Sequence, residues 1–167
     1  MKAKFAILLL SLFTLLNCAE KEWDIAPIYI TIYAEDTKGN DLLSESNSNN
    51  ILENDIKVVY NEMEFPLGED MSEQTTTKAY LATLSGLSLR GQGDGNYLLF
   101  GEFDGAKSWD DTFEIYWGDG TSDEIKFTRD FRWKVNGNPD ISNDNVYFNG
   151  VKAKEDVIIK IINTSEK

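Results

Sequence analysis

The chain has 167 residues, no histidine, one cysteine and a formal net charge of −13 at pH 7. Without histidine, zinc sites built on imidazole and nucleophilic sites built on Ser-His or Cys-His pairs are excluded. The single cysteine excludes an intramolecular disulfide, and the acidic charge argues against nucleic acid as a partner because phosphate backbones would be repelled.

The N-terminus predicts a signal peptide over residues 1–17. Lys2 and Lys4 supply a positive region, and residues 5–16 form a run of apolar and small side chains. This run is too short for a permanent membrane span, which needs about 20 apolar residues, so a secretory signal is favoured. Asn17 fits ordinary cleavage after Ala19 poorly, because small residues are preferred there.

The segment Leu15-Leu16-Asn17-Cys18 resembles a lipobox, in which a leucine lies three residues before a cysteine that receives a diacylglyceryl thioether. Leu16 and Asn17 depart from the small residues of the usual pattern. The alternatives are an uncleaved signal anchor or an incidental cysteine. Each buried methylene contributes about 0.8 kcal/mol, so acyl chains on Cys18 predict stable attachment to a membrane.

The mature chain is divided into residues 18–26, the lipidated cysteine with an acidic tether, and residues 27–167, a single domain. Cleavage would remove two lysines and no acidic residue, which changes the formal net charge from −13 to −15. About 150 residues suffice for one domain with its own core. Such a charge is typical of a solvated surface.

Period-two alternation begins after Pro27. Ile28, Ile30 and Ile32 alternate with Tyr29, Thr31 and Tyr33, which predicts a half-buried strand. A long polar loop is expected over residues 36–54. The further predicted strands span residues 56–60, 63–67, 79–84, 87–90, 97–103, 112–117, 121–128, 131–135, 146–148 and 157–162.

Turn chemistry separates these segments. Asn61-Glu62 predicts a tight hairpin turn, the glycine-dense stretch 91–96 predicts another, and Gly118-Asp119-Gly120 gives the clearest hairpin in the chain. No lysine or helix start follows residues 91–96, so a phosphate-binding loop is disfavoured. Many short strands with frequent turns predict an all-β fold, an antiparallel Ig-like β-sandwich.

The segment Ile115-Tyr116-Trp117-Gly118-Asp119-Gly120-Thr121 resembles the strand-turn signature of polycystic kidney disease repeats, which are extracellular Ig-like β-sandwich domains. The resemblance covers about seven residues and implies the sandwich fold. The later His-Tyr and Gly-x-Tyr-x-Val features of those repeats are missing. A structural role for this tight turn is favoured over ligand binding.

The wider layout resembles small Bacteroidetes-type surface lipoproteins. The resemblance rests on Trp23-Asp24, the Asp36–Leu43 loop, Gly101–Gly105, Trp117–Thr121 and Phe148-Asn149-Gly150. No activity is assigned to that group, so no functional residue is transferred. In such lipoproteins, a lysine and acidic residues behind the lipidated cysteine mark export to the outer face of the outer membrane.

Glu20, Lys21 and Glu22 resemble that export signal. The resemblance implies an outer-membrane protein exposed at the cell surface, while the alternative is a solvated linker. The membrane is then a partner through the lipid anchor.

Aromatic residues supply one candidate ligand site. Trp109, in a loop after residues 105–108, is the tryptophan expected to be most exposed and able to stack on a sugar ring. Trp117 and Trp133 are interpreted as core or cross-strand packing residues. A glycan or an envelope protein is the partner class that this pattern favours.

Carboxylates supply a possible calcium site, the only cofactor considered. Asp94, Asp104, Asp110 and Asp111 lie around the ends of one predicted strand connection, and Asp140, Ser142 and Asp144 have alternating oxygen spacing. Ordinary turns capped by Asp and Asn are the alternative.

Three carboxylate pairs also invite comparison with glycosidases: Glu62 with Glu64, Glu102 with Asp104, and Asp110 with Asp111. Such pairs are expected by chance in a chain this acidic, and no cleft is signalled. A non-enzymatic binding domain is therefore the leading hypothesis. A structural or assembly component of an envelope complex is the alternative, and an enzyme comes third.

Overall fold

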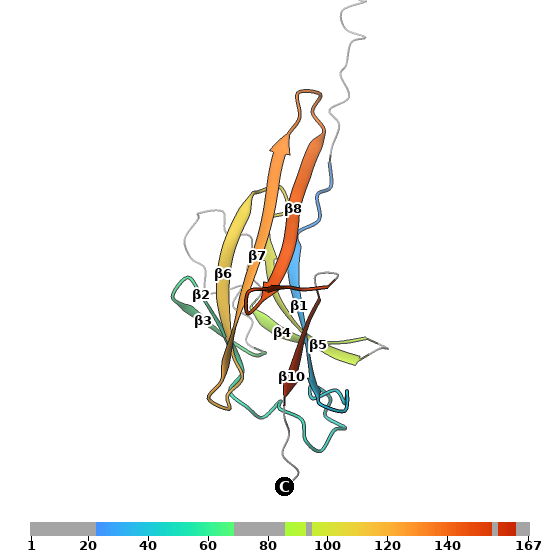
Figure 1. The fold of residues 1–167 in the computed structure, drawn as a ribbon, viewed down its shortest axis with the longest axis vertical. Coiled ribbons are helices and arrows are strands. Elements are labelled where there is room, and N and C mark those ends of the chain that lie inside the picture. Colours follow the sequence, from blue (N-terminus) through green and yellow to red (C-terminus); the bar gives the residue numbers. More distant parts are fainter. Residues whose placement is uncertain (1–22, 69–85, 93–94, 155–156, 163–167) are drawn as a thin grey trace, which may run out of the picture.

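The computed structural model describes residues 23–68, 86–92, 95–154 and 157–162. Within these ranges the chain is all-β, and its strands form two sheets that pack as a sandwich (Figure 1). The four-stranded sheet has the order β10 (Val157–Ile162), β1 (Ile28–Asp36), β5 (Gly95–Phe103), β4 (Leu87–Gln92). The six-stranded sheet has the order β3 (Met63–Pro66), β2 (Lys57–Tyr60), β6 (Trp109–Tyr116), β7 (Ser122–Trp133), β8 (Pro139–Phe148), β9 (Val151–Lys152).

This architecture confirms the predicted β-sandwich. The strand pairs are antiparallel except β1 with β10, which run parallel with Tyr33 opposite Ile159. A parallel neighbour needs a crossover rather than a tight turn, and here the intervening chain includes the whole six-stranded sheet. Among the described residues there is no helix long and apolar enough to cross a bilayer.

The core lies between the sheets and is formed by alternate residues of each strand. In β1 the isoleucines at 28, 30 and 32 are buried, as their alternation predicted. At the centre, aromatic rings pack edge-on or tilted: Phe103 lies 4.4 Å from Phe127 and Phe100 lies 4.8 Å from Phe113, centroid to centroid. Such pairs contribute beyond the area that they bury, so this cluster fixes the spacing of the two sheets.

Two tight turns confirm the local turn predictions. Asn61 and Glu62 have φ values of 50° and 65°, so the β2–β3 hairpin has the positive angles of a two-residue turn without glycine. At the other turn, a Cβ on Gly118 would lie 2.5 Å from the backbone nitrogen of Asp55. The Trp117–Thr121 turn therefore has a packing role, as interpreted from the sequence.

The hairpin of β7 and β8 is longer than predicted. Residues 131–135 were expected to form a separate strand, but β7 continues through a register shift between Thr128 and Asp130 and ends at Trp133. Such an irregularity accommodates an extra residue while pairing continues beyond it. The polar residues that open β8 were not predicted as strand, because they lack the apolar alternation on which the prediction relied. The predicted strand 79–84 lies outside the described residues.

A buried polar cluster connects the two sheets. Asp123 on β7 accepts hydrogen bonds from Trp117 Nε1 at 2.7 Å and Asn149 Nδ2 at 2.8 Å, and pairs with Lys160 Nζ of β10 at 2.6 Å. Burial disfavours ionisation of Asp123, but these three donors outweigh it and hold the pKa of its carboxyl below the usual value. This cluster attaches β10 to the opposite sheet, 37 residues away from Asp123 in the sequence.

A second buried group holds the segment before β1. Arg129, on β7, binds Asp144 through two hydrogen bonds of 3.0 and 2.6 Å and also donates to the carbonyl oxygens of Ala26 and Gly105. A Cβ on Gly105 would lie 2.0 Å from the Ala26 oxygen. The N-terminal segment is thus packed directly against the β5–β6 connection.

Candidate functional site

The outer face of the four-stranded sheet carries exposed aromatic and aliphatic side chains. Alternation in each strand and the observed registers place these residues on it. We call it the tyrosine face, and it comprises Tyr29, Thr31, Tyr33, Glu35, Ser88, Arg90, Tyr97, Leu99, Glu102, Ile159 and Ile161.

Side chains align across all four strands of this face. Tyr33 is opposite Ile159 on β10, and Arg90 on β4 is opposite Tyr97 on β5. The β1–β5 register continues to Tyr33 and Tyr97, whose ring centroids are 5.7 Å apart at an interplanar angle of 43°. Cross-strand neighbours of this kind form a continuous surface of two rings with an aliphatic group at one end and a guanidinium at the other.

Several side chains of the tyrosine face are accessible to solvent, unlike those of the core. Tyr29, Ile159 and Ile161 have exposed fractions of 43%, 51% and 52%, and Tyr33 and Tyr97 are half-buried. Burial and the neighbouring Glu102 carboxylate, which accepts a hydrogen bond from the Tyr29 hydroxyl, raise the pKa of Tyr29. Its hydroxyl therefore stays protonated at neutral pH and remains a donor.

Polar groups lie among and around the aromatic and aliphatic side chains of the tyrosine face. Thr31 and Ser88 present hydroxyls within the face, and Glu35, Glu102 and Arg90 present charges around it. An apolar shelf with a few polar groups is what recognition of a neutral, hydroxyl-rich ligand requires.

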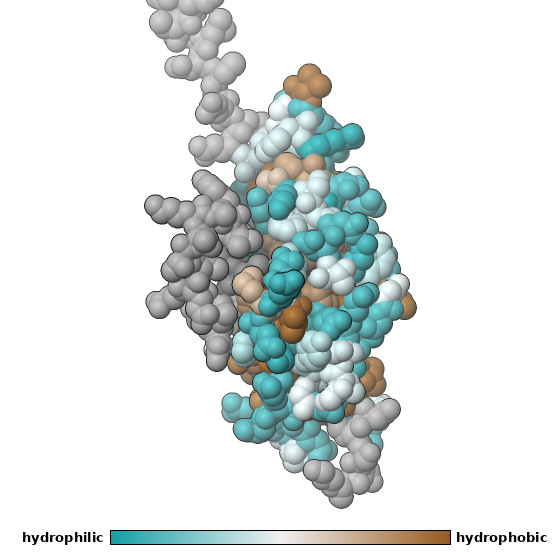
Figure 2. All heavy atoms as spheres, turned by 90° about the vertical axis from the view of Figure 1, so that its left-hand side faces the viewer, coloured by the Kyte–Doolittle hydropathy of each residue, from teal (hydrophilic) through white to brown (hydrophobic). Residues whose placement is uncertain are grey.

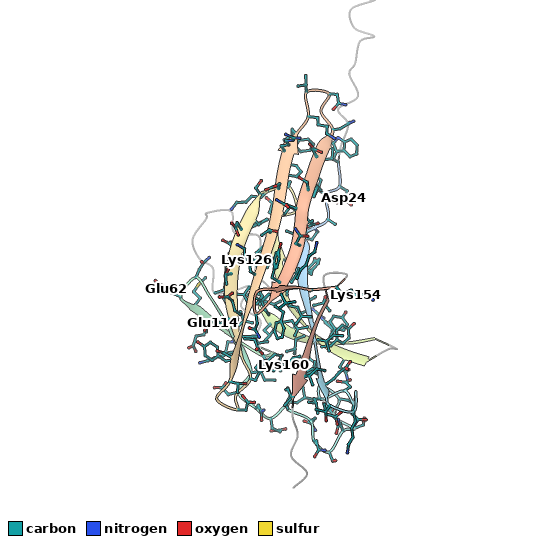
Figure 3. The ribbon with its side chains drawn as sticks, in the orientation of Figure 1. Asp24, Glu62, Glu114, Lys126, Lys154 and Lys160 are labelled. Carbon is teal, nitrogen blue, oxygen red and sulfur yellow. The ribbon has the colours of Figure 1, made fainter. Side chains whose placement is uncertain are left out.

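The outer face of the six-stranded sheet is different. We call it the charged face, and its ionic groups pair within it: Lys126 with Asp110 at 2.6 Å and Lys57 with Glu64 at 2.9 Å. Figure 3 shows Glu114 and Lys126, which lie on the neighbouring strands β6 and β7 of this sheet.

Trp109 does not occupy the exposed position predicted for it. Its ring packs 5.4 Å from Phe103 and 5.8 Å from Phe127, and its Nε1 donates to the Asp104 carbonyl at 2.8 Å. Lys107 Nζ lies 4.3 Å above the same ring. The prediction of Trp109 as the most exposed tryptophan is wrong, because β6 begins at this residue and directs it toward the core.

The other two tryptophans divide between core and surface. Trp117 is fully buried, which confirms its core interpretation. Trp133 is 54% exposed, so of its two interpretations the core one is wrong; its cross-strand partner is Pro139, and its ring packs 5.3 Å from Phe131. Trp133 is the last residue of β7, in the β7–β8 hairpin that extends past the other strands in Figure 1.

The residues proposed for calcium do not converge in the described part of the chain. Asp104 accepts from the backbone of Ala106, Asp110 pairs with Lys126, and Asp111 accepts from Tyr60. Asp94 lies outside the described residues. Among the residues that the structure describes, no group of three or more His, Cys, Asp or Glu could hold a metal ion.

The second acidic set is engaged by cations instead. Asp140 pairs with Arg132 and Lys134, and Asp144 pairs with Arg129. The alternating spacing of Asp140, Ser142 and Asp144 therefore reflects their place in strand β8 rather than a binding loop.

In each carboxylate pair considered for glycosidase chemistry, the two carboxylates have different surroundings. Glu64 pairs with Lys57 while Glu62 lies in the β2–β3 turn, and Glu102 accepts from Tyr29 while Asp104 caps the next turn. The adjacent pair on β6 is divided between the two sides of the strand. Cys18 and the segment Glu20, Lys21 and Glu22 lie outside the described residues.

Sequence reasoning missed the tyrosine face, although the signal was present. The alternation that placed the β1 isoleucines inside also placed Tyr29 and Tyr33 outside. Tyr97 and Ile159 could not be added, because sequence does not reveal that β5 and β10 flank β1. Comparison with protein-family models, with curated proteins and with solved structures gives no match to this chain.

Proposed function

We propose that this chain is a membrane-anchored lipoprotein, exposed on the outer membrane through Cys18, whose domain binds a glycan on the tyrosine face without catalysing a reaction. The aligned row of Ile159, Tyr33, Tyr97 and Arg90 carries the proposal. Sugar rings stack on aromatic side chains through their C–H faces, and their hydroxyls need nearby donors and acceptors.

The charge distribution supports a neutral ligand. The formal net charge of −13 repels polyanions, so an acidic polymer is a poor candidate. On the tyrosine face the ionic residues lie around the aromatic rings: the carboxylates of Glu35 and Glu102 can accept hydrogen bonds from hydroxyls, and Arg90 can donate to them. A neutral glycan fits this combination.

A protein ligand is the second candidate, and β10 supports it. This strand is at the edge of its sheet and exposes about half of Ile159 and Ile161. Exposed aliphatic side chains on an edge strand are suited to contact with another polypeptide. The role of an envelope assembly component would use this same edge.

The test compares two tyrosines that have equivalent positions on opposite faces. Tyr33→Ala removes a ring from the tyrosine face, and Tyr147→Ala removes one from the charged face, where Tyr147 is opposite Lys126. We expect the wild-type protein to bind one or more neutral oligosaccharides on a glycan array. Tyr33→Ala should abolish this binding, and Tyr147→Ala should leave it unchanged.

Thermal unfolding of both variants supplies the control, since both residues are half-buried surface residues with similar expected effects on stability. Equal loss of binding in the two variants would contradict the assignment to the tyrosine face. An array without any signal from the wild-type protein would overturn the glycan proposal. If a crosslinker placed at position 159 then captured a defined protein on intact cells, this result would favour a protein ligand that contacts β10.

A further inference from the structure

The β7–β8 hairpin ends in exposed apolar side chains. We call residues 131–141 the hairpin tip. Val135, in its turn, is fully exposed, Trp133 is 54% exposed and Ile141 is 42% exposed. Figure 2 shows a hydrophobic group at the extreme end of the molecule at which Figure 1 places this hairpin. Exposed aliphatic and aromatic side chains gathered at the end of a protruding hairpin form a surface suited to an apolar partner.

The N-terminal segment reaches the same end of the molecule. Trp23, the first described residue, donates from Nε1 to the Gly137 carbonyl in the turn of the tip at 3.0 Å. Figure 3 shows the next residue, Asp24, beside the outer part of β8. Four residues lie between Cys18 and Trp23, and the five Cα–Cα steps that separate the two span at most about 18 Å. A lipid on Cys18 therefore holds Trp23, whose side chain is bonded to the hairpin tip, within about 18 Å of the lipidated residue.

Charge at the tip is compatible with lipid. Its ionic side chains are Arg132, Lys134 and Asp140, two cations and one anion, in a chain with a formal net charge of −13. Arg132 and Lys134 both pair with Asp140 but remain 80% and 50% exposed, and they lie one residue to either side of Trp133. Tryptophan is favoured at membrane interfaces, where its ring is amphipathic, and cations beside it meet phosphate headgroups.

From these observations, and resting on the proposed lipid anchor, we infer that the hairpin tip inserts Val135 and Trp133 into the interfacial layer of the bilayer. The tip and the acylated cysteine then form two contacts with one membrane. Two contacts fix the orientation of the domain, whereas the lipid anchor alone fixes only one point of it. The long axis of the molecule would stand away from the bilayer, with the loop over residues 37–56 at its far end (Figure 1).

The test places a fluorescent label on each end of the full, acylated protein. V135C carries the label on the tip, and S48C carries it in the exposed far loop. Cys18 is blocked by its lipid, so the introduced thiol alone reacts. Each protein is reconstituted in vesicles of phosphatidylethanolamine and phosphatidylglycerol, and flotation of the vesicles measures attachment. A second vesicle preparation contains lipids with a quencher near the headgroup end of the acyl chain.

We expect both proteins to float, with C18A remaining at the bottom of the gradient. The V135C label should shift its emission to shorter wavelength and be quenched by the modified lipids, whereas the S48C label should show neither effect. Flotation without quenching of V135C would overturn the inference and leave the anchor intact. A spectral shift without quenching would indicate that another copy of this chain buries the label, and would also overturn the inference. Failure of both proteins to float would overturn the anchor, and the inference with it.

Discussion

The two outer faces of the sandwich expose different kinds of side chain. On the charged face, Lys126 and Lys57 are each paired with a carboxylate of a neighbouring strand. On the tyrosine face, Tyr29, Ile159 and Ile161 remain about half exposed. Charged side chains that pair with each other keep a surface soluble and leave few groups free to bind a ligand. Exposed rings and aliphatic side chains provide apolar area that a ligand can contact.

The faces also differ in how they are supported. The charged face belongs to a sheet joined by successive hairpins from β6 to β9, with neighbouring strands close in sequence. The tyrosine face includes β10, which pairs with β1 and is attached to the opposite sheet through Lys160 and Asp123. The position of β10, at one edge of the tyrosine face, therefore depends on the buried Lys160–Asp123 ion pair between the two sheets.

The largest effect is expected from Asp123→Ala. This change leaves Lys160 and Trp117 Nε1 without their carboxylate partner, and removing one member of a buried pair costs about 3–5 kcal/mol in the free energy of unfolding. Urea unfolding measures this cost. We also expect weaker ligand binding on the tyrosine face, because β10 loses its attachment.

Acid supplies an independent check of this cluster. Because the pKa of Asp123 is lowered by folding, its contribution to stability is present above the unfolded pKa and is lost as pH falls through the folded pKa. Wild-type stability should therefore fall between about pH 5 and pH 2, and Asp123→Ala should show a shallower dependence. Equal pH dependence of the two proteins would show that the cluster does not contribute in this way.

The second effect concerns Trp109, which packs against the core beneath the charged face. Trp109→Ala removes its contacts with Phe103 and Phe127 and should lower the free energy of unfolding by about 3 kcal/mol. Ligand binding per folded molecule should be unchanged, since the ring lies away from the tyrosine face. If Trp109→Ala lost ligand binding without losing stability, the ligand site would include Trp109, and its assignment to the tyrosine face would be wrong.

The smallest effect is expected from Asp110→Asn on the charged face. Its carboxylate is 72% exposed and its Lys126 partner is 41% exposed, so water and salt screen the pair. The urea midpoint should hardly change at low salt and should be indistinguishable from wild type at high salt. A large loss of stability would show that the two faces do not differ as described.

Local sequence patterns predicted the elements whose partners are nearby. The β2–β3 hairpin follows from two apolar runs around Asn61-Glu62, and β1 follows from its isoleucine alternation. The first half of β8 was missed because residues 140–145 are polar except for Ile141. Those residues form a strand because they pair with the end of β7. The strand propensity of single residues does not predict such pairing.

The candidate site was less predictable because it depends on contacts between distant segments. Trp109 was assigned to the surface on the polarity of the residues before it, whereas its orientation is set by the register of β6 with β7. Tyr33 and Tyr97 become neighbours only when β1 lies beside β5. Which side chains share a face is thus a property of the sheet order, which a single sequence does not contain.

The parallel pairing of β1 with β10 has a consequence for the order of folding. Thr31 pairs with Val157, so this contact closes a loop of more than one hundred residues. Such distant pairing is slow, because the entropy of the loop must be overcome before the contact forms. During synthesis, β1 leaves the ribosome long before β10 exists. The first strand of the domain therefore waits for one of its two neighbours until the last described strand has been made, and the sandwich closes late.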